Sequence, residues 1–457
     1  MLERLFRLKE RGADVRTEIL GGATTFVTMA YIAVVNPAVL AFAGIPEGPS
    51  TVATILAAVF GSLFMGLYAN RPIAVAPYMG ENAFIAFGLV SFGIGWQQRI
   101  GIVFLSGLGF LLVTLFRVRS WLANSISPSM KHSFAVGIGL FLAFIGLYET
   151  GIVASYVEGS PYQELLAAGS GVLGHPPVPV KVGNLRDPAV ILAVFGFLLI
   201  VTLLHHRLPG AVLLGMAATA VLGTFFGLGE APKGVVALPF TGEYDISAIA
   251  LQLDVAGVLK LSLLPVLLTL FLMSFLDTLG TLVGVGAVGD MLDERGNFRD
   301  IERPMVVDAA ACMFSALLGT STSGAYIESA AGIREGARTG LAAVVTALLF
   351  AATLFFVPLL GPLQHLKYAY GPALVAVGLL MVGSVTRIRF DDMTESVPAF
   401  ATIAMMVFTY NIGNGLTAGL AIYPILKIAS GRFRDLNAGS VVLGLLCGAY
   451  YVFGVPH

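Results

Sequence analysis

The sequence predicts an all-α polytopic membrane protein with about 14 transmembrane segments. Hydrophobic residues make up 57% of the 457 residues and charged residues only 12%, whereas a soluble domain carries about 25% charged residues. Uncharged apolar stretches of roughly 17–25 residues recur, which is the length that crosses a bilayer as a helix. The alternating strands of roughly ten residues that build a membrane β-barrel are absent. The net charge of −1 gives no indication of a nucleic-acid partner.

The N-terminal residues predict the orientation of the chain. Five basic residues precede the first apolar segment, and they are Arg4, Arg7, Lys9, Arg11 and Arg16. Basic residues stay preferentially on the cytoplasmic side, so residues 1–17 should be cytoplasmic. Because a full-length apolar span follows directly, we expect this span to direct insertion into the plasma (bacterial inner) membrane without a cleaved signal.

The remaining spans alternate with basic inner loops and more polar outer loops. Spans are predicted at about 19–40, 51–69, 100–116, 134–148, 189–204, 211–227, 264–288, 305–318, 341–357, 370–383, 398–411 and 415–429. Basic residues predict that loops 117–131, 205–207, 295–303 and 387–389 are cytoplasmic, and that loop 149–187 lies outside. A last apolar segment, 441–453, either crosses the membrane or lies on its surface.

Two further apolar stretches, 73–88 and 319–333, are too interrupted for single helices. In the first, Pro77 and Gly80 predict an extended piece, followed by a half-helix from Asn82. In the second, Gly, Ser and Thr loosen the chain before Glu328, which begins a short helix. Irregular backbone at membrane depth persists only where it is buried in protein or lines a cavity. We therefore expect these stretches, as spans 3 and 10, to form a binding site.

The positions of the two interrupted stretches predict an internal repeat. Each is third in a group of seven spans, and seven spans reverse the direction of the chain. The two groups should therefore be inverted repeats about an axis in the membrane plane. This arrangement would bring both half-helices to mid-depth beside the span at 264–288.

Asp277 is the only charged residue between Lys260 and Asp290, near the middle of span eight. A carboxylate at this depth costs roughly 2.5–3.5 kcal/mol on insertion scales, so it should face protein or water and have a function. We predict that it helps to bind a polar substrate. Thr281, four residues later, shares its helix face.

Other polar residues in the spans have structural alternatives. Thr25 belongs to a seam of Thr and Tyr side chains in span one, which either lines the site or joins packed helices. Asp308 lies near the start of span nine, and we interpret it as an interfacial or capping carboxylate rather than a substrate ligand. No metal-ligand spacing is evident, and no cofactor is expected.

Several motifs resemble one transporter family. They are VRTEILGGATTFVTMAYIAVVNP (15–37), APYMGENAFIAF (76–87), FRVRSW (116–121), LDTLGTLVGV (276–285), LGTSTSGAYIESAAGI (318–333) and ARTG (337–340). With these motifs the sequence resembles the azaguanine-like adenine/guanine/hypoxanthine permeases of the nucleobase–ascorbate transporter superfamily. The resemblance implies proton-coupled import of a purine base.

The resemblance also implies two domains built from both repeats. Spans 1–4 and 8–11 would form a core domain, and spans 5–7 and 12–14 a gate domain. In this sequence the core corresponds to 18–132 and 256–358, and the gate to 133–255 and 359–431. The apolar segment at 432–457 would follow the gate.

By motif match, Asp277 and Glu328 fall on the substrate acids of the family, and Asn82 on its polar residue in span three. Thr281 occupies a position where pyrimidine-transporting relatives tend to carry a histidine. Glu81 departs from the family pattern and either adds a third carboxylate to the site or faces a cytoplasmic vestibule. Tyr326 and Phe84 either stack on the base or pack in the core.

These residues predict a chemistry for transport. A carboxylate accepts two N–H donors side by side, as a nucleobase edge presents them. Neighbouring acids resist ionising together, so Glu328, Asp277 and Glu81 are candidate proton carriers. Alternative functions are transport of xanthine or uracil, or of an anion by the same architecture, although paired acids disfavour an anion. An enzyme is not expected. The expected partners are a purine base, protons and lipid, and the assembly state is open, with a homodimer as one option.

Overall fold

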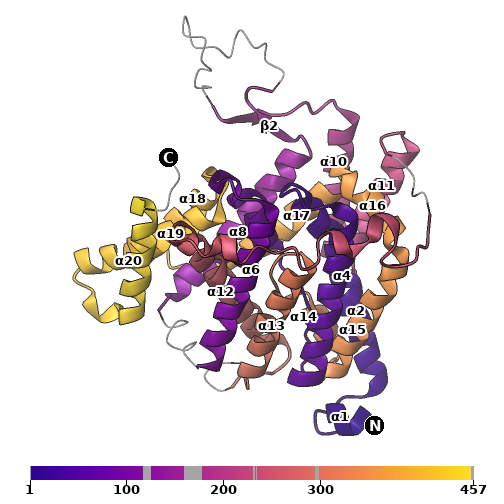
Figure 1. The fold of residues 1–457 in the computed structure, drawn as a ribbon, viewed down its shortest axis with the longest axis horizontal. Helices are drawn as coiled ribbons and strands as arrows, with labels where there is room; N and C mark the ends of the chain where they lie inside the picture. Colours follow the sequence, from indigo (N-terminus) through magenta and orange to yellow (C-terminus); the bar gives the residue numbers. More distant parts are fainter. Residues whose placement is uncertain are drawn as a thin grey trace, which may run out of the picture.

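The computed structural model describes residues 2–116, 125–158, 178–229, 232, 234–293 and 298–453. Within them the chain is mostly helical (Figure 1), and nine helical runs are long and apolar enough to cross a membrane. These runs are Val15–Ala41, Glu47–Ala69, Trp96–Leu115, Pro128–Glu149, Pro188–His205, Leu264–Val288, Gly340–His365, Lys367–Arg387 and Ile412–Ala429. The prediction of a multi-pass helical membrane protein is confirmed. The count of fourteen spans and the inverted symmetry remain predictions.

The predicted loops at 117–131, 149–187 and 295–303 lie partly outside the described residues, as does most of the motif at 116–121. In the described part of the predicted outer loop, β2 (Val153–Ser155) pairs antiparallel with β3 (Val180–Val182).

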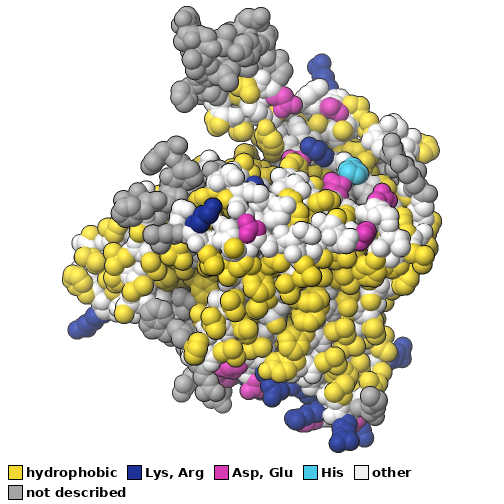
Figure 2. Space-filling view, viewed as in Figure 1, with side chains coloured by type: hydrophobic (Ala, Val, Ile, Leu, Met, Phe, Trp, Pro, Cys, Tyr) yellow, Lys and Arg dark blue, Asp and Glu magenta, His cyan; other side chains and the backbone are white. Residues whose placement is uncertain are grey.

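The surface has the distribution expected for a protein in a bilayer. Hydrophobic side chains form a broad band around the middle of the visible face (Figure 2). Lys and Arg side chains gather at the end of the molecule that holds α1 (Leu2–Phe6). Exposed apolar side chains are favourable in lipid, so this band marks the region that the membrane would cover.

The helices form two packed groups. The first group contains α2 (Val15–Met29), α3 (Ile32–Ala41), α4 (Glu47–Phe64), α5 (Met79–Ala83), α6 (Trp96–Leu115), α12 (Leu264–Val288), α13 (Glu302–Leu318), α14 (Ser329–Arg334) and α15 (Gly340–Thr353). The second group contains α8 (Pro128–Glu149), α10 (Pro188–His205), α11 (Ala211–Phe225), α17 (Lys367–Val382), α18 (Met393–Phe408), α19 (Ile412–Ala429) and α20 (Ala438–Phe453). Helix α16 (Val357–His365) contacts members of both groups. Contacts within each group are more extensive than those between them.

Polar residues just before the helices explain where several of them begin. Ser127 accepts a hydrogen bond from Met130 N at 3.3 Å, and Pro128 then occupies the first turn of α8. Asn411 caps α19 in the same way, accepting from Gly413 N at 2.8 Å. Such side chains satisfy backbone donors that have no partner within the helix, and Pro fits the first turn because it lacks one. The C-terminal apolar segment also forms a helix, α20.

A buried acid in the motif at 15–37 holds the start of α15. Glu18 Oε1 accepts hydrogen bonds from Arg338 N at 2.7 Å and Thr339 N at 3.0 Å, and its Oε2 accepts from Ala342 N at 3.1 Å. Gly22 allows the close approach, since a Cβ there would lie 2.4 Å from Ala342 O. The motifs at 15–37 and 337–340 therefore contact each other: the Glu18 carboxylate of the first motif caps the N-terminus of α15, which begins in the second.

The two interrupted stretches meet in a short antiparallel pair of strands. β1 (Val75–Pro77) pairs with β4 (Ser323–Ala325), and Ala76 lies opposite Gly324. The expected extended pieces are thus present, although α5 begins at Met79 rather than at Asn82 as predicted. We call residues 74–82 and 320–329 the β1–β4 crossing. It lies within the first helix group, where β1 contacts α4 and β4 contacts α13 and α12.

Candidate functional site

Backbone and side-chain hydrogen bonds fix the ends of the β1–β4 crossing. Tyr78 N donates to Thr322 O and Tyr326 N donates to Ala74 O, each at 2.9 Å, which extends the pairing beyond the strands. Ala74 N donates to Ser329 Oγ at 3.0 Å. Because its backbone groups are paired, this irregular segment can exist at membrane depth.

Asp277 lies in the middle of α12 and is partly exposed. In the part of the chain that the structure describes, its carboxylate has no hydrogen bond or ion pair. Its charge interacts with those of Glu328 and Glu81. Helix α12 also contacts α14 and α5. The structure therefore brings together three acids that are far apart in the sequence, while their role in binding a substrate stays a prediction.

Glu328 immediately precedes α14 and is also partly exposed. Its Oε1 accepts a hydrogen bond of 2.8 Å from the hydroxyl of Tyr31, which lies between α2 and α3. The sequence indicated the acid and the short helix after it, but not this tyrosine partner.

Glu81 and Asn82 follow β1 on α5, and both are completely buried. Neither carboxylate oxygen of Glu81 has a hydrogen-bond partner among the described residues. A solvent-open vestibule, one of the two alternatives for Glu81, does not fit this burial. An unpaired carboxylate in a protein interior is costly, so Glu81 has the character of a group that takes up a proton or a ligand.

Asn82 belongs to a buried hydrogen-bonded cluster around Asn36 in α3. Asn82 Nδ2 donates to Asn36 Oδ1 at 2.9 Å. Asn36 Nδ2 in turn donates to Thr54 Oγ1 at 2.8 Å and to Thr320 Oγ1 at 3.0 Å. This cluster ties α3, α4 and both broken segments together. Asn36 was missed because an Asn before Pro37 is also typical of a helix kink.

Asp308 requires a correction. It is completely buried, so the interpretation as an interfacial carboxylate is wrong. Its Oδ2 accepts hydrogen bonds of 2.9 Å from Thr278 Oγ1 and from Ala325 N in β4. The hydroxyl of Tyr78 lies 3.0 Å from Thr278 Oγ1 and completes this chain. Asp308 therefore connects α12 and α13 to the strand pair, a role that its distance from the end of a span could not indicate.

The other predicted residues differ in their surroundings. Thr281 is largely buried one turn after Asp277. Thr25 is buried against α14, where a Cβ on Gly332 would lie 2.3 Å from its Oγ1. Phe84 is buried near Gly413 of α19. These contacts of Thr25 and Phe84 favour the packing alternative for both.

Tyr326 has a structural counterpart in Tyr78. The two rings are nearly parallel, with an interplanar angle of 8° and a centroid separation of 6.4 Å. The Tyr326 hydroxyl donates to Pro77 O, so each tyrosine is anchored through its hydroxyl. This pair gives the crossing two rigid aromatic faces close to the acids.

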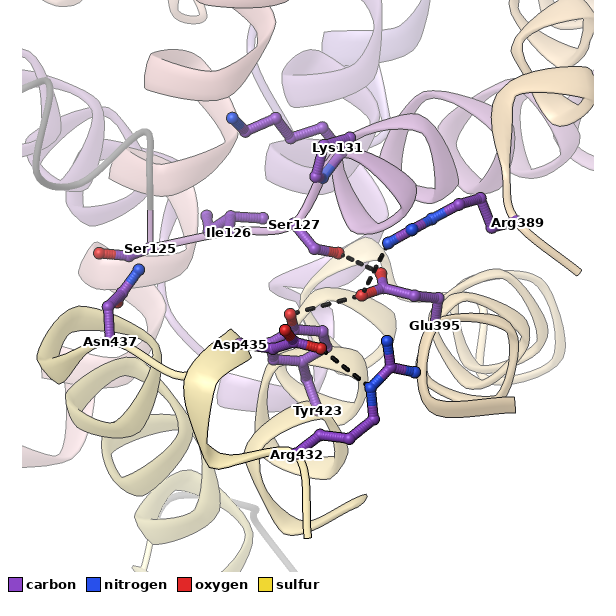
Figure 3. Close-up of a pocket in the computed structure, with 11 residues that line it drawn as sticks. Ser125, Ile126, Ser127, Lys131, Arg389, Glu395, Tyr423, Arg432, Asp435 and Asn437 are labelled. Atoms are coloured by element: carbon purple, nitrogen blue, oxygen red, sulfur yellow. Dashed lines mark hydrogen bonds and ion pairs between the residues drawn. The ribbon is translucent and has the colours of Figure 1, made fainter. Parts of the chain in front are cut away.

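A cavity of about 340 Å³ lies elsewhere, at one end of α8, α18 and α19 (Figure 3). Four of its charged side chains are paired: Arg389 contacts Glu395 at 3.4 Å, and Arg432 contacts Asp435 at 3.0 Å. Glu395 also accepts a hydrogen bond from Ser127 Oγ at 2.6 Å. Nearby, hydrogen bonding from Thr394 and the charge of Arg432 lower the pKa of Asp392 to about 2. None of the predicted substrate residues lines this cavity. No group of side chains suited to a metal ion is found in the described ranges.

A helical membrane protein with acids on two interrupted segments and on an adjoining helix has the architecture of a membrane transporter. Residues 16–417 match the Permease family (Xan_ur_permease), and the chain belongs to this family. The match confirms the resemblance to the purine permeases of the nucleobase–ascorbate transporter superfamily and the expectation that the protein is not an enzyme.

Relatives of similar length extend over almost the whole chain. Adenine permease AdeP of Escherichia coli is 38% identical over 459 residues, covering 100% of this chain and 97% of its own. Guanine/hypoxanthine permease PbuO of Bacillus subtilis is 38% identical over 446 residues, covering 97% of this chain and 98% of its own. Putative permease MJ0326 of Methanocaldococcus jannaschii is 39% identical over 453 residues, with 99% and 98% covered.

Solved structures share the fold at low sequence identity. The transmembrane domain of the cyanobacterial bicarbonate transporter BicA matches with a TM-score of 0.61 and 17% identity, covering 89% of this chain and 97% of that one. SLC26A9 matches with a TM-score of 0.63 and 11% identity, covering 94% and 67%. At these identities the likeness concerns the fold alone.

Proposed function

We propose that this protein imports a purine nucleobase, namely adenine, guanine or hypoxanthine, by proton symport through alternating access. The observation that carries the proposal is a set of three acids: Glu81 and Glu328 in the β1–β4 crossing, and Asp277 on the adjoining helix α12. Relatives named as adenine and guanine/hypoxanthine permeases support the substrate class.

In this proposal the acids both bind the substrate and carry the coupling proton. The free carboxylate of Asp277 accepts N–H donors of the base edge, and Glu328 provides a second contact. Three interacting acids in a low dielectric do not all hold a negative charge together, so Asp277, Glu328 and Glu81 share the coupling proton. Asn82 and Thr281 add polar contacts, and the faces of Tyr326 and Tyr78 supply a stacking surface.

An anion carrier with the same fold is the main rival. An anionic substrate requires positive charges or helix N-termini, whereas acids at the site repel it. The fold shared with a bicarbonate transporter does not select the substrate, because one fold supports many functions. We keep xanthine and uracil as alternative substrates.

The first prediction concerns coupling. Uptake of a radiolabelled purine into cells that lack their own purine transporters should increase as the external pH falls, because the inward proton gradient then drives symport. A protonophore should abolish accumulation. Uptake that depends on sodium at constant pH and persists with the protonophore would contradict proton symport.

We further propose that the fourteen spans form two inverted repeats, with the first helix group as core and the second as gate. Extensive packing within each group supports this division. The concentration of Lys and Arg at the end that holds α1 supports a cytoplasmic N-terminus (Figure 2).

The second prediction tests this orientation. Arg186→Cys, in the exposed outer loop, should react with a membrane-impermeant maleimide added to intact cells. Arg299→Cys, in the predicted inner loop, should react only after the cells are opened. The native Cys312 and Cys447 are buried and should give little background. The reverse labelling pattern would contradict the proposed topology.

A further inference from the structure

Tyr31 connects the first membrane span to the acid of the second broken segment. Its hydroxyl lies 2.8 Å from Glu328 Oε1, although the residues are 297 positions apart in the sequence. The sequence placed Tyr31 only in a polar seam of span one. The fold gives it a specific partner.

The backbone changes its hydrogen-bond pattern where Tyr31 lies. Ala30 N donates to Phe26 O at 2.8 Å, as in an α-helix, whereas Ala33 N donates to Ala30 O at 3.2 Å, as in a tighter turn. Tyr31 occupies the short gap between α2 and α3, within the continuous run Val15–Ala41. Its position is therefore set by a local feature of the span.

A tight backbone contact holds α2 against α14, the helices next to the two partners. A Cβ on Gly332 would lie 2.1 Å from Gly21 O, so α14 and α2 touch through backbone atoms. Gly332 lies one turn beyond Glu328 on α14. Close packing of this kind tolerates little movement, so the hydroxyl of Tyr31 faces Glu328 in a defined geometry.

Tyr31 is buried, and the single proton of its hydroxyl is already donated to Glu328. We propose that Tyr31 is a positioning residue: it holds the Glu328 carboxylate in the orientation that receives the purine and sets the pH range of uptake. This inference rests on the proposed role of Glu328. A neutral donor to a carboxylate favours its charged form and restricts its rotamers.

Tyr31→Phe removes the hydroxyl and keeps the ring. We expect the KM for purine uptake to rise about tenfold, while kcat changes less, since one hydrogen bond to a charged acceptor is lost. Asp277 on α12 and Tyr326 beside β4 are the other titratable groups that interact with Glu328. Without the Tyr31 donor, the negative charge of Asp277 is no longer opposed at Glu328, and the charged form of Glu328 is less favoured. In proton symport, uptake falls as the pH rises because the acids lose the coupling proton. In Tyr31→Phe this fall should occur at higher pH, by up to about one unit, because Glu328 keeps its proton longer. The measurement is initial uptake over a pH series at matched membrane expression.

Tyr368→Phe is the matched control, because it removes a buried hydroxyl that has no partner among the described residues and lies in the second helix group. Tyr368→Phe should change neither the KM for purine uptake nor the pH at which uptake falls. In a Glu328→Gln background, Tyr31→Phe should cause no further loss of purine affinity, because the two changes act on one interaction.

Three outcomes would overturn the inference, and they separate it from the proposed function. If Glu328→Gln impairs purine binding but Tyr31→Phe leaves KM and the pH at which uptake falls unchanged, the positioning role is wrong and the proposed function stands. If Tyr31→Phe lowers thermal stability but leaves KM unchanged, Tyr31 has a purely structural role, and the positioning role is again wrong. If Glu328→Gln has no effect on binding, both proposals fail.

Discussion

Asp277→Asn is expected to lower purine affinity by roughly 10–150-fold, because it removes a charge-assisted hydrogen bond of roughly 1.5–3 kcal/mol. The change keeps the shape of the side chain but replaces one acceptor oxygen with a donor, which faces the N–H groups of the base. Asp277 has no hydrogen-bond partner elsewhere in the described chain, so the fold should tolerate the substitution. Purine binding would be measured by isothermal titration calorimetry on purified protein.

The control for Asp277 must be an acid without a role in the crossing. Asp290 lies just beyond the end of α12 and is exposed, and its left-handed φ of 54° suits Asn as well as Asp. Asp290→Asn should therefore bind purine as the unchanged protein does. Near-normal binding by Asp277→Asn, or an equal loss in both variants, would remove Asp277 from the proposed site.

Asp308 illustrates why the sequence could not supply this control. Its place near the start of span nine suggested a carboxylate at the membrane surface, and on that basis a substitution would be nearly harmless. In the structure its carboxylate accepts the N–H of Ala325 and the hydroxyl of Thr278. Depth along one helix does not reveal a contact with a strand from another segment, because that contact depends on the tertiary fold.

The sequence alone indicates that Asp277 and Glu328 lie in polar surroundings. A carboxylate within a long apolar run is too costly to be incidental, so its presence alone indicates a polar environment. The two interrupted stretches were predictable on similar grounds, since Gly, Pro and Ser exclude a continuous helix. Their pairing as β1 and β4 required the relative placement of segments about 250 residues apart, which a local pattern does not contain.

Neutral polar residues carry a weaker signal than acids. Asn36, Tyr31 and Thr278 make the hydrogen bonds that orient the crossing, yet each resembles an ordinary polar residue of a packed membrane helix. Thr25 is a similar case, because its place in a polar seam left two alternatives open and the structure shows it buried against α14. For such side chains only the fold identifies the partner.

Lys427→Met is expected to destabilise the protein by roughly 3–5 kcal/mol, because it breaks a buried charge network. Lys427 is 1% exposed, and its Nζ lies 2.9 Å from Glu395 and 3.2 Å from Asp435. It joins α18, α19 and the segment before α20. Its two partners, Glu395 and Asp435, line the cavity in Figure 3. Removing the cation leaves the Glu395 carboxylate buried, with Arg389 at 3.4 Å as its remaining cation.

Thermal unfolding in detergent would measure the effect, with Arg7→Gln as the control. Arg7 forms an exposed pair with Glu10 at 3.8 Å, and such surface pairs contribute about 0–1 kcal/mol. A double variant, Lys427→Met with Glu395→Leu, should be more stable than Lys427→Met alone, because no buried carboxylate is then left without its main partner. Equal unfolding temperatures for Lys427→Met and Arg7→Gln would show that the network contributes no more than a surface ion pair. If the double variant were the least stable of all, packing around Lys427 would outweigh its charge.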